Sequence, residues 1–242
     1  MMKARREELA ENLKRIRDEI PKHLNLIVVT KTFPASDVEI LYQLGERDFA
    51  ENRVQELVAK RDELQGRVGS DARWHYQGQI QSNKISILNR YADVIHSLDQ
   101  ERHIEKIDSS RHVLLQVNLD KVINGDQSGE EDATGQKRDA DGRRAGVALA
   151  DSEDFARKVF ARFGENFEGV MGVSPHHLGV TSEEKRQGFI RLREMSEQIR
   201  AFAPRARWIS AGMSDDYKIA IAEGATHIRL GSSILGLRTP KN

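Results

Sequence analysis

Residues 26–32 read Leu-Ile-Val-Val-Thr-Lys-Thr, and this stretch is the best guide to the fold. Its first four residues form a short, unbroken apolar run, and three of them are β-branched. Such a run is typical of a strand that is buried on both faces, as in parallel sheets covered by helices. The stretch therefore predicts an α/β protein whose first strand ends at a threonine and a lysine.

The rest of the chain repeats this alternation of strand and helix. Further candidate strands lie at residues 47–51, 73–77, 93–98, 113–119, 168–173, 207–211 and 226–230. Helical patterns separate them, for example at residues 53–65, 83–90, 152–163, 182–202 and 215–222. Eight strand-then-helix units predict one closed (β/α)8 TIM barrel, forming a single domain over residues 1–242. A doubly wound open sheet is the alternative.

Two segments stand outside this repeat. Residues 1–20 are predicted to form an extra N-terminal helix, amphipathic over residues 3–19. Residues 120–144 have almost no apolar side chains, so they are expected to form a long polar insertion loop after the fifth strand. The helix after the first strand is predicted to begin with a capping box of Ser36 and Glu39.

The composition excludes several classes of function. Lys plus Arg and Asp plus Glu number 38 each, so no global positive field favours nucleic acid or an anionic membrane as a partner. The chain has no cysteine, which excludes disulfides, thiolate metal sites and cysteine nucleophiles. Its charged N-terminus lacks the apolar core of a signal peptide, and no run approaches the roughly 18 apolar residues of a membrane span. A cytoplasmic protein is therefore predicted.

Lys31 is the first candidate for chemistry. Functional groups of a parallel barrel sit at the C-terminal ends of its strands, and Lys31 lies where the first strand delivers it to the barrel mouth. Desolvation there would favour the neutral amine, which is a nucleophile toward carbonyl groups. The alternative is a lysine that only extends from the strand end into solvent. Position alone leaves both interpretations open.

The last two strands end in residues suited to an anion. Barrels commonly bind phosphate with the loops after strands seven and eight, through backbone N–H groups, glycine and hydroxyls. Ser214, Gly231 and Ser232 supply these parts. Asp215 and Asp216 follow directly, and they would repel a phosphate unless they point away.

Arg229 is expected to face the interior of the barrel, because it lies two residues before Gly231 on the same strand. A buried arginine is costly unless it is paired. Its partner is expected to be a carboxylate, or else the ring nitrogen or phosphate of a ligand. The adjacent histidines His176 and His177 cannot readily face one metal ion together, so no metal site is predicted.

Two other polar residues have a simpler interpretation. Asn52 and Ser82 each precede a helical pattern, so either side chain is suited to capping a helix, and capping is favoured for Ser82.

Five ordered stretches resemble one known family. They are Val28-Val29-Thr30-Lys31-Thr32, Phe49-Ala50-Glu51-Asn52 with Val54-Gln55-Glu56, Trp74-His75-Tyr76-Gln77-Gly78 with Gln81-Ser82-Asn83-Lys84, Gly212-Met213-Ser214-Asp215-Asp216 and Ile228-Arg229-Leu230-Gly231-Ser232. In this order they resemble the pyridoxal phosphate homeostasis proteins (YggS/PROSC type), which are related to the N-terminal domain of alanine racemase. The resemblance spans residues 26–238, nearly the whole chain.

The resemblance implies a fold-type III barrel that binds pyridoxal 5′-phosphate (PLP) as a Schiff base. It implies an internal aldimine at Lys31 and an Arg229 that faces the pyridine nitrogen. An arginine does not give up its proton, so the ring nitrogen stays unprotonated and the ring is a poorer electron sink. The remaining residues implied to bind the cofactor are Asn52, Met213, Ser214, Gly231 and Ser232.

The chain departs from the family pattern at several positions. Ala50 stands where members usually have glycine, and Arg53 where many have an aromatic residue. The insertion at 120–144 is longer than usual. These departures concern loop geometry and leave the implied cofactor site intact.

Three functions remain open on this basis. The first is intracellular PLP homeostasis, that is storage of the cofactor and its delivery to apo-PLP enzymes, without robust catalysis. The second is a PLP-dependent amino-acid racemase, and the third is a Schiff-base aldolase without PLP. A racemase needs a second acid/base opposite the lysine, which the alanine racemases take from a C-terminal domain and its dimer, whereas eleven residues follow Gly231 here. The carrier, as a monomer, is therefore favoured, and an aldolase would leave Arg229 without a role.

Overall fold

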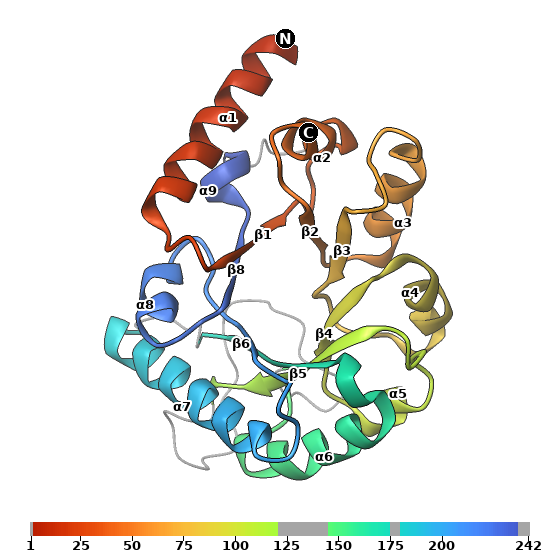
Figure 1. The fold of residues 1–242 in the computed structure, drawn as a ribbon, viewed down its shortest axis with the longest axis vertical. Coiled ribbons are helices and arrows are strands. Elements are labelled where there is room, and N and C mark those ends of the chain that lie inside the picture. Colours follow the sequence, from red (N-terminus) through yellow and green to blue (C-terminus); the bar gives the residue numbers. More distant parts are fainter. Residues whose placement is uncertain (1, 121–144, 175–179, 237–242) are drawn as a thin grey trace.

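The computed structural model describes residues 2–120, 145–174 and 180–236. Eight parallel strands close into a barrel in chain order, with β1 paired to β8. The strands are β1 (Asn25–Val29), β2 (Asp48–Glu51), β3 (Arg73–Tyr76), β4 (Val94–Leu98), β5 (His112–Asn118), β6 (Phe167–Val173), β7 (Trp208–Ser210) and β8 (His227–Leu230). The (β/α)8 barrel is confirmed and the open sheet is wrong (Figure 1).

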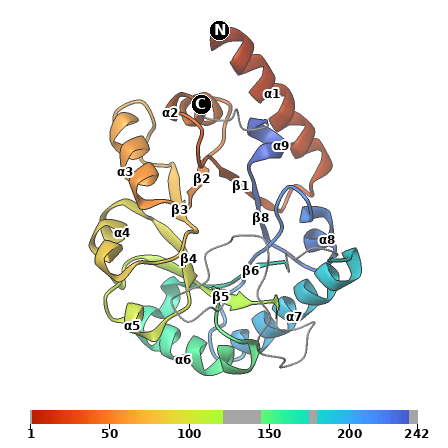
Figure 2. The same cartoon turned by 180° about the vertical axis from the view of Figure 1, so that it is seen from behind.

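Helices surround the strands, as Figure 1 and the reverse view in Figure 2 show. They are α2 (Ala35–Gln43), α3 (Val54–Glu63), α4 (Ile85–Tyr91), α5 (Glu101–Ile104), α6 (Ser152–Phe163), α7 (Ser182–Arg200) and α8 (Tyr217–Ala222), with α1 (Met2–Glu19) before β1 and α9 (Ser232–Leu235) after β8. Short 3-10 helices are η1 (Ser82–Lys84), η3 (Leu149–Asp151) and η4 (Gly164–Asn166). In the parts of the chain that the structure describes, no helix is both long and apolar enough to cross a membrane. Of the predicted insertion loop, residues 121–144 lie outside the described residues.

The first strand shows how the sequence divides its side chains between two cores. Leu26 and Val28 belong to the large core between the strands and the helices. Ile27 and Val29 contact Ala50 on the other face of the strand. Since side chains alternate along a strand, this second face is the barrel interior, and residue 31 follows in the same register.

The predicted capping box of Ser36 and Glu39 is wrong. Helix α2 begins two residues earlier, with Pro34 at its N-cap and no side-chain cap. Glu39 pairs instead with Arg67 of the next unit. A complete capping box does occur at the start of α7, where Thr181 caps the backbone N–H of Glu184 and the Glu184 side chain returns the bond.

Three further predictions of helix starts are corrected. Asn52 does not cap α3, whose N-cap is Arg53, and Ser82 lies inside η1 and contacts His103 Nε2 at 3.0 Å. Helix α8 begins at Tyr217 rather than at Asp215. In each case the first turn lies within two residues of its expected place. The helices are therefore present as predicted, and only their starting residues differ.

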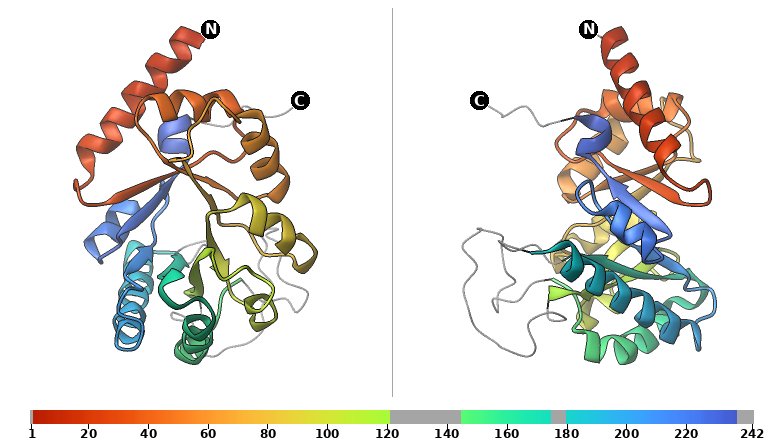
Figure 3. Two further views of the ribbon diagram at one scale, coloured as in Figure 1. Left: turned by 45° about the vertical axis from the view of Figure 1, so that its right-hand side comes forward. Right: turned by 90° about the vertical axis from the view of Figure 1, so that its left-hand side faces the viewer.

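The N-terminal helix α1 contacts α9, the helix that follows β8. The side chains of Arg5, Asn12 and Arg15 on α1 donate hydrogen bonds to carbonyl oxygens of α9 at 3.0 Å each. These carbonyls lie at the C-terminal end of a helix, where no further turn supplies N–H donors. Figure 3 shows α1 running alongside α9 at the edge of the barrel. The extra helix therefore holds in place the segment that follows β8.

Candidate functional site

A cavity of about 570 Å³ opens at the C-terminal ends of the strands. Parallel barrels carry their functional groups at this end. Six of the seven residues predicted to bind a cofactor line this cavity, namely Lys31, Met213, Ser214, Arg229, Gly231 and Ser232. Asn52 is not among the lining residues that the structure describes, so its predicted contact with a cofactor ring stays a prediction.

Lys31 is half-buried and lies two residues after the end of β1, at the wall of the cavity. The next residue, Thr32, has φ of 69°, and no other non-glycine residue in the described ranges has a positive φ. A β-branched residue is strained in this region, so its surroundings must hold it there. Glu56 does so, because its carboxylate accepts the Thr32 backbone N–H at 2.6 Å. The backbone is thus turned and fixed immediately after Lys31.

A buried ion pair holds the chain immediately before Lys31. Lys60 on α3 donates to Glu51 Oε1 at 2.5 Å and to the Thr30 carbonyl oxygen at 2.6 Å. The Thr30 hydroxyl also donates to Glu51, at 2.5 Å, and all three residues are buried. Burial raises the pKa of Glu51, while the charge and hydrogen bond of Lys60 oppose that rise. These three residues, called the Glu51 cluster below, hold the C-terminal end of β1 in place.

Sequence reasoning missed Lys60. The available signal was its spacing, since Val54, Leu57 and Lys60 are three residues apart and all three are buried on α3. A lysine on the apolar stripe of a helix needs a buried acceptor, and a glutamate stands at the end of the preceding strand.

The predicted anion site is a cup of Ser214, Gly231 and Ser232. The Ser232 hydroxyl donates to the Ser214 hydroxyl at 3.0 Å. A Cβ at Gly231 would lie 3.1 Å from the Val29 carbonyl oxygen, so the backbone approaches β1 more closely than a side chain would comfortably allow. Ser232 also opens α9, and first-turn N–H groups have no helical acceptor before them. The cup therefore combines hydroxyl and N–H donors.

The two aspartates beside the cup behave differently. Asp216 is buried and faces its own loop, because it accepts the Met213 backbone N–H at 2.7 Å and the hydroxyl of Ser174. Asp215 is exposed and lines the cavity. Asp216 is already engaged by hydrogen-bond donors, so its repulsion of an anion is reduced. Asp215 faces the cavity and still repels an anion, but solvent screens its charge.

Arg229 is buried on β8 and lines the cavity. It donates to the Ser210 carbonyl at 2.6 Å, the Ser210 hydroxyl at 2.8 Å and the Gly172 carbonyl at 3.0 Å. Burial lowers the pKa of Arg229 to about 10, and the charge of Asp216 opposes that change. The side chain is therefore cationic at neutral pH. Within the described residues it is held by neutral acceptors and not by the direct carboxylate partner that the sequence allowed.

The described residues contain no group of three or more histidines, aspartates or glutamates placed to hold a metal ion. His176 and His177 lie outside the described residues.

Comparisons with known proteins agree with this geometry. The family described as "Alanine racemase, N-terminal domain" matches residues 5–239. A pyridoxal phosphate homeostasis protein of Corynebacterium glutamicum is 35% identical over 217 residues, which is 89% of this chain and 90% of that protein. PipY of Synechococcus elongatus, solved with PLP bound, superposes with a TM-score of 0.76 at 30% identity, over 94% of this chain and all of that one.

A more distant solved structure shares the fold alone. Alanine racemase of E. faecalis superposes with a TM-score of 0.68 at 14% identity. The superposition covers 96% of this chain and 58% of the racemase.

Proposed function

The chain belongs to the family of the pyridoxal phosphate homeostasis proteins, within the alanine racemase N-terminal domain fold, and on this premise we propose that it binds PLP and serves in PLP homeostasis. One observation carries the proposal. A single cavity at the barrel mouth brings together a lysine, a buried arginine and a cup of hydroxyl and N–H donors. These are the groups that an aldehyde, a pyridine nitrogen and a phosphate require.

The residues of the cavity fit the three polar parts of this cofactor. The cup of Ser214, Gly231 and Ser232 is proposed to bind the phosphate, with Met213 beside it. Arg229 is proposed to donate to the pyridine nitrogen, and Lys31 to form the covalent Schiff base. When bound, PLP supplies a reactive aldehyde and an electron-withdrawing ring. The fixed backbone on both sides of Lys31 supports its role, because it aims the amine from the strand end.

The proposed role is storage and delivery of the cofactor rather than robust catalysis. Arg229 stays protonated and can only donate, so a ring nitrogen that it contacts stays unprotonated. A racemase also needs acid/base groups on both faces of the substrate. Among the described residues that line the cavity there is no tyrosine or histidine, and the carboxylates are Asp120 and Asp215. This composition supports the carrier over the racemase.

Three finer expectations belong to the same proposal. Apo-PLP enzymes are the proposed recipients of the cofactor, the protein is proposed to act as a monomer, and its proposed location is the cytoplasm. The neutral net charge and the lack of cysteine support the last expectation.

The test uses purified protein that has been incubated with PLP and reduced with borohydride. Peptide mass mapping then identifies the modified residue, and a racemase assay is run on an unreduced portion of the same sample. A pyridoxyl adduct on Lys31 without turnover is the expected result. Brisk turnover would show that the protein is an enzyme rather than a carrier. The absence of an adduct would show that Lys31 does not bind the cofactor covalently.

A further inference from the structure

A line of buried polar side chains crosses the interior of the barrel beneath Arg229. The Arg229 guanidinium donates to Ser210 Oγ at 2.8 Å, and Ser210 Oγ lies 3.1 Å from His96 Nδ1. His96 Nε2 lies 2.8 Å from His75 Nδ1, and His75 Nε2 lies 2.8 Å from Asp48 Oδ1. These five residues, called the polar column below, come from five different strands, β8, β7, β4, β3 and β2.

The inner members of the column have no contact with solvent. Ser210, His96 and His75 are fully buried. Burial lowers the pKa of His96 well below its usual value, so this ring is neutral. A polar group in the interior of a barrel destabilises the fold unless it is hydrogen-bonded. Here each ring nitrogen of the two histidines has a partner within hydrogen-bonding distance.

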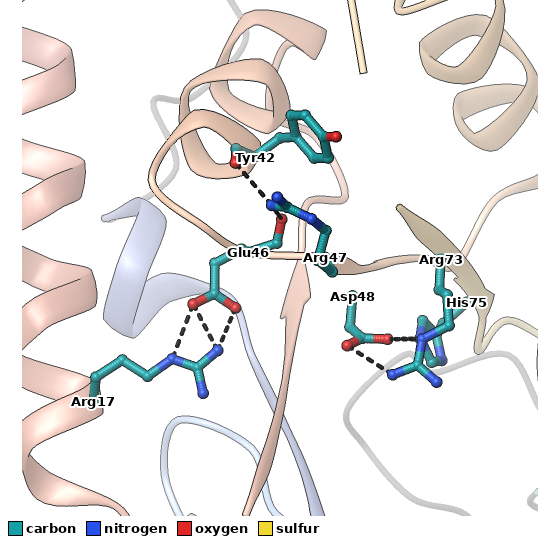
Figure 4. A network of polar contacts seen from close by, with 7 residues as sticks. All are labelled: Arg17, Tyr42, Glu46, Arg47, Asp48, Arg73 and His75. Atoms are coloured by element: carbon teal, nitrogen blue, oxygen red, sulfur yellow. Dashed lines mark hydrogen bonds and ion pairs between the residues drawn. The ribbon is translucent and has the colours of Figure 1, made fainter. Parts of the chain in front are cut away.

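The outer end of the column is an ionised carboxylate. Asp48 also pairs with Arg73, with Nε at 2.7 Å from Asp48 Oδ1, and Figure 4 shows Asp48 facing Arg73 and His75. Partial burial raises the pKa of Asp48, but its hydrogen bonds with His75 and Arg73 and the charge of Arg73 outweigh this and lower it. The column therefore runs from a cation that only donates hydrogen bonds to an anion that only accepts them.

These two ends allow one proton arrangement in which each inner member donates once and accepts once. Ser210 accepts from Arg229, so its hydroxyl proton goes to His96 Nδ1. His96 then carries its proton on Nε2 and donates to His75 Nδ1. His75 in turn carries its proton on Nε2 and donates to Asp48. In the opposite arrangement His75 would be a cation, and Ser210 would accept from both Arg229 and His96.

We propose that the polar column positions Arg229 for PLP, with Ser210, His96 and His75 as positioning residues that act through the guanidinium. This inference rests on the proposed function. The three hydrogen bonds to Ser210 and Gly172 use both Nη atoms of the guanidinium and fix its plane, while two of its five N–H groups have no partner among the described residues. Asp48 balances the buried charge through a chain of neutral groups, which polarise one another.

A double-mutant cycle tests whether Ser210 acts through Arg229. Ser210→Ala in the full-length protein is expected to weaken PLP binding about ten-fold, as for the loss of one hydrogen bond to a charged group, and to shift the visible absorbance band of bound PLP. In an Arg229→Lys background the same change is expected to cost less than about two-fold, since coupled residues are not additive. Equal losses in both backgrounds, or no loss in the first, would overturn the proposal.

The control is His103→Gln. His103 is as buried as the column histidines but contacts Ser82 instead. The His103→Gln substitution is expected to lower the free energy of unfolding without changing the affinity for PLP or the absorbance band of bound PLP. If it weakened PLP binding as much as Ser210→Ala, general destabilisation would explain both results and the column would have no special role.

A second measurement needs no cofactor, so it separates a failure of this inference from a failure of PLP binding. Nitrogen-15 NMR of the ligand-free protein is expected to show His75 and His96 as neutral Nε2–H tautomers. Exchange of the Arg229 guanidinium protons is expected to accelerate about ten-fold in Ser210→Ala, for the loss of one hydrogen bond. A protonated Nδ1 on His96, or unchanged exchange, would overturn the column even if PLP binds.

Discussion

The hydroxyl oxygens of Ser214 and Ser232 lie 3.0 Å apart, although one residue follows β7 and the other follows β8. The parallel pairing of β7 with β8 brings these two loops side by side. Two hydroxyls from neighbouring loops form a preorganised contact for one anion, since neither has to be moved into place when the anion binds.

Removal of either hydroxyl is expected to weaken the binding of PLP but not of pyridoxal, which lacks the phosphate. Ser214→Ala and Ser232→Ala should each reduce the affinity for PLP about ten-fold, the usual effect of one hydrogen bond to a charged group. Equilibrium titration with both ligands checks this. A parallel loss for pyridoxal would place the two serines elsewhere in the site.

Lys31→Ala is expected to abolish the borohydride-stable adduct while the barrel stays folded. Lys31 lies at a strand end beside the cavity and is only half-buried, so the free energy of unfolding should change by less than about 1 kcal/mol. Peptide mapping and urea unfolding measure the two effects. Lys218→Ala is the matched control, because the Lys218 side chain is 72% exposed and Lys218 is far from Lys31 in the sequence. An adduct that persists in Lys31→Ala would show that another amine is the attachment point.

Lys60→Met is expected to destabilise the protein by about 3–5 kcal/mol, because it leaves Glu51 as a buried and unpaired carboxylate. Glu51 is fully buried, and its Oε2 has no hydrogen-bond partner within the described residues even with Lys60 present. Urea unfolding measures the loss. Lys14→Ala, which removes an exposed pair with Asp18, should change the stability by less than about 1 kcal/mol. Similar effects of the two variants would mean that the Glu51 cluster contributes no more than a surface ion pair.

The stability is expected to fall as the pH decreases below about 6.5, in part because of His227. Burial lowers the pKa of His227 from 6.5 to about 3, so the folded protein keeps this ring neutral where the unfolded chain takes up a proton. Its stabilising contribution is therefore present above pH 6.5 and is lost as the pH falls toward 3. Between pH 6 and 4, His227→Gln should reduce the slope of unfolding free energy against pH by about 1.4 kcal/mol per unit.

Urea titrations at several pH values compare these slopes. The raised pKa values of Glu46 and Glu51 act in the opposite direction, but they are common to both proteins and cancel in the comparison. Identical slopes would show that His227 takes up its proton in the folded state as readily as in the unfolded chain.

The elements of the barrel were predictable because each strand carries its own local signal. The run from Leu26 to Val29 and its seven successors all became strands, and helix α6 has the predicted bounds of residues 152–163. Helix starts were less predictable. Ser36 and Glu39 have the spacing of a capping box, but Pro34 has a fixed φ suited to the position before the first turn, so the helix begins ahead of them.

The cavity residues at strand ends were also predictable, whereas the polar column was not. His75, His96 and Ser210 each stand within a buried strand, which marks them as unusual, but the sequence does not reveal that they meet. Their contact depends on the stagger between strands, which sets which inward side chains share a layer of the barrel. Local periodicity contains no information on that stagger, so such a network becomes visible only in three dimensions.

The pairing of β1 with β8 also fixes when the cavity can form during synthesis. Lys31 leaves the ribosome about 180 residues before Ser214, and the cup is completed only with Ser232. The bonds from α1 to the carbonyls of α9 join a helix made before the barrel strands with one made after them. A nascent chain must therefore keep β1 without its partner β8 until residues 227–230 have been made. Any partner that recognises the assembled cavity thereby distinguishes chains that include Ser232 from shorter ones.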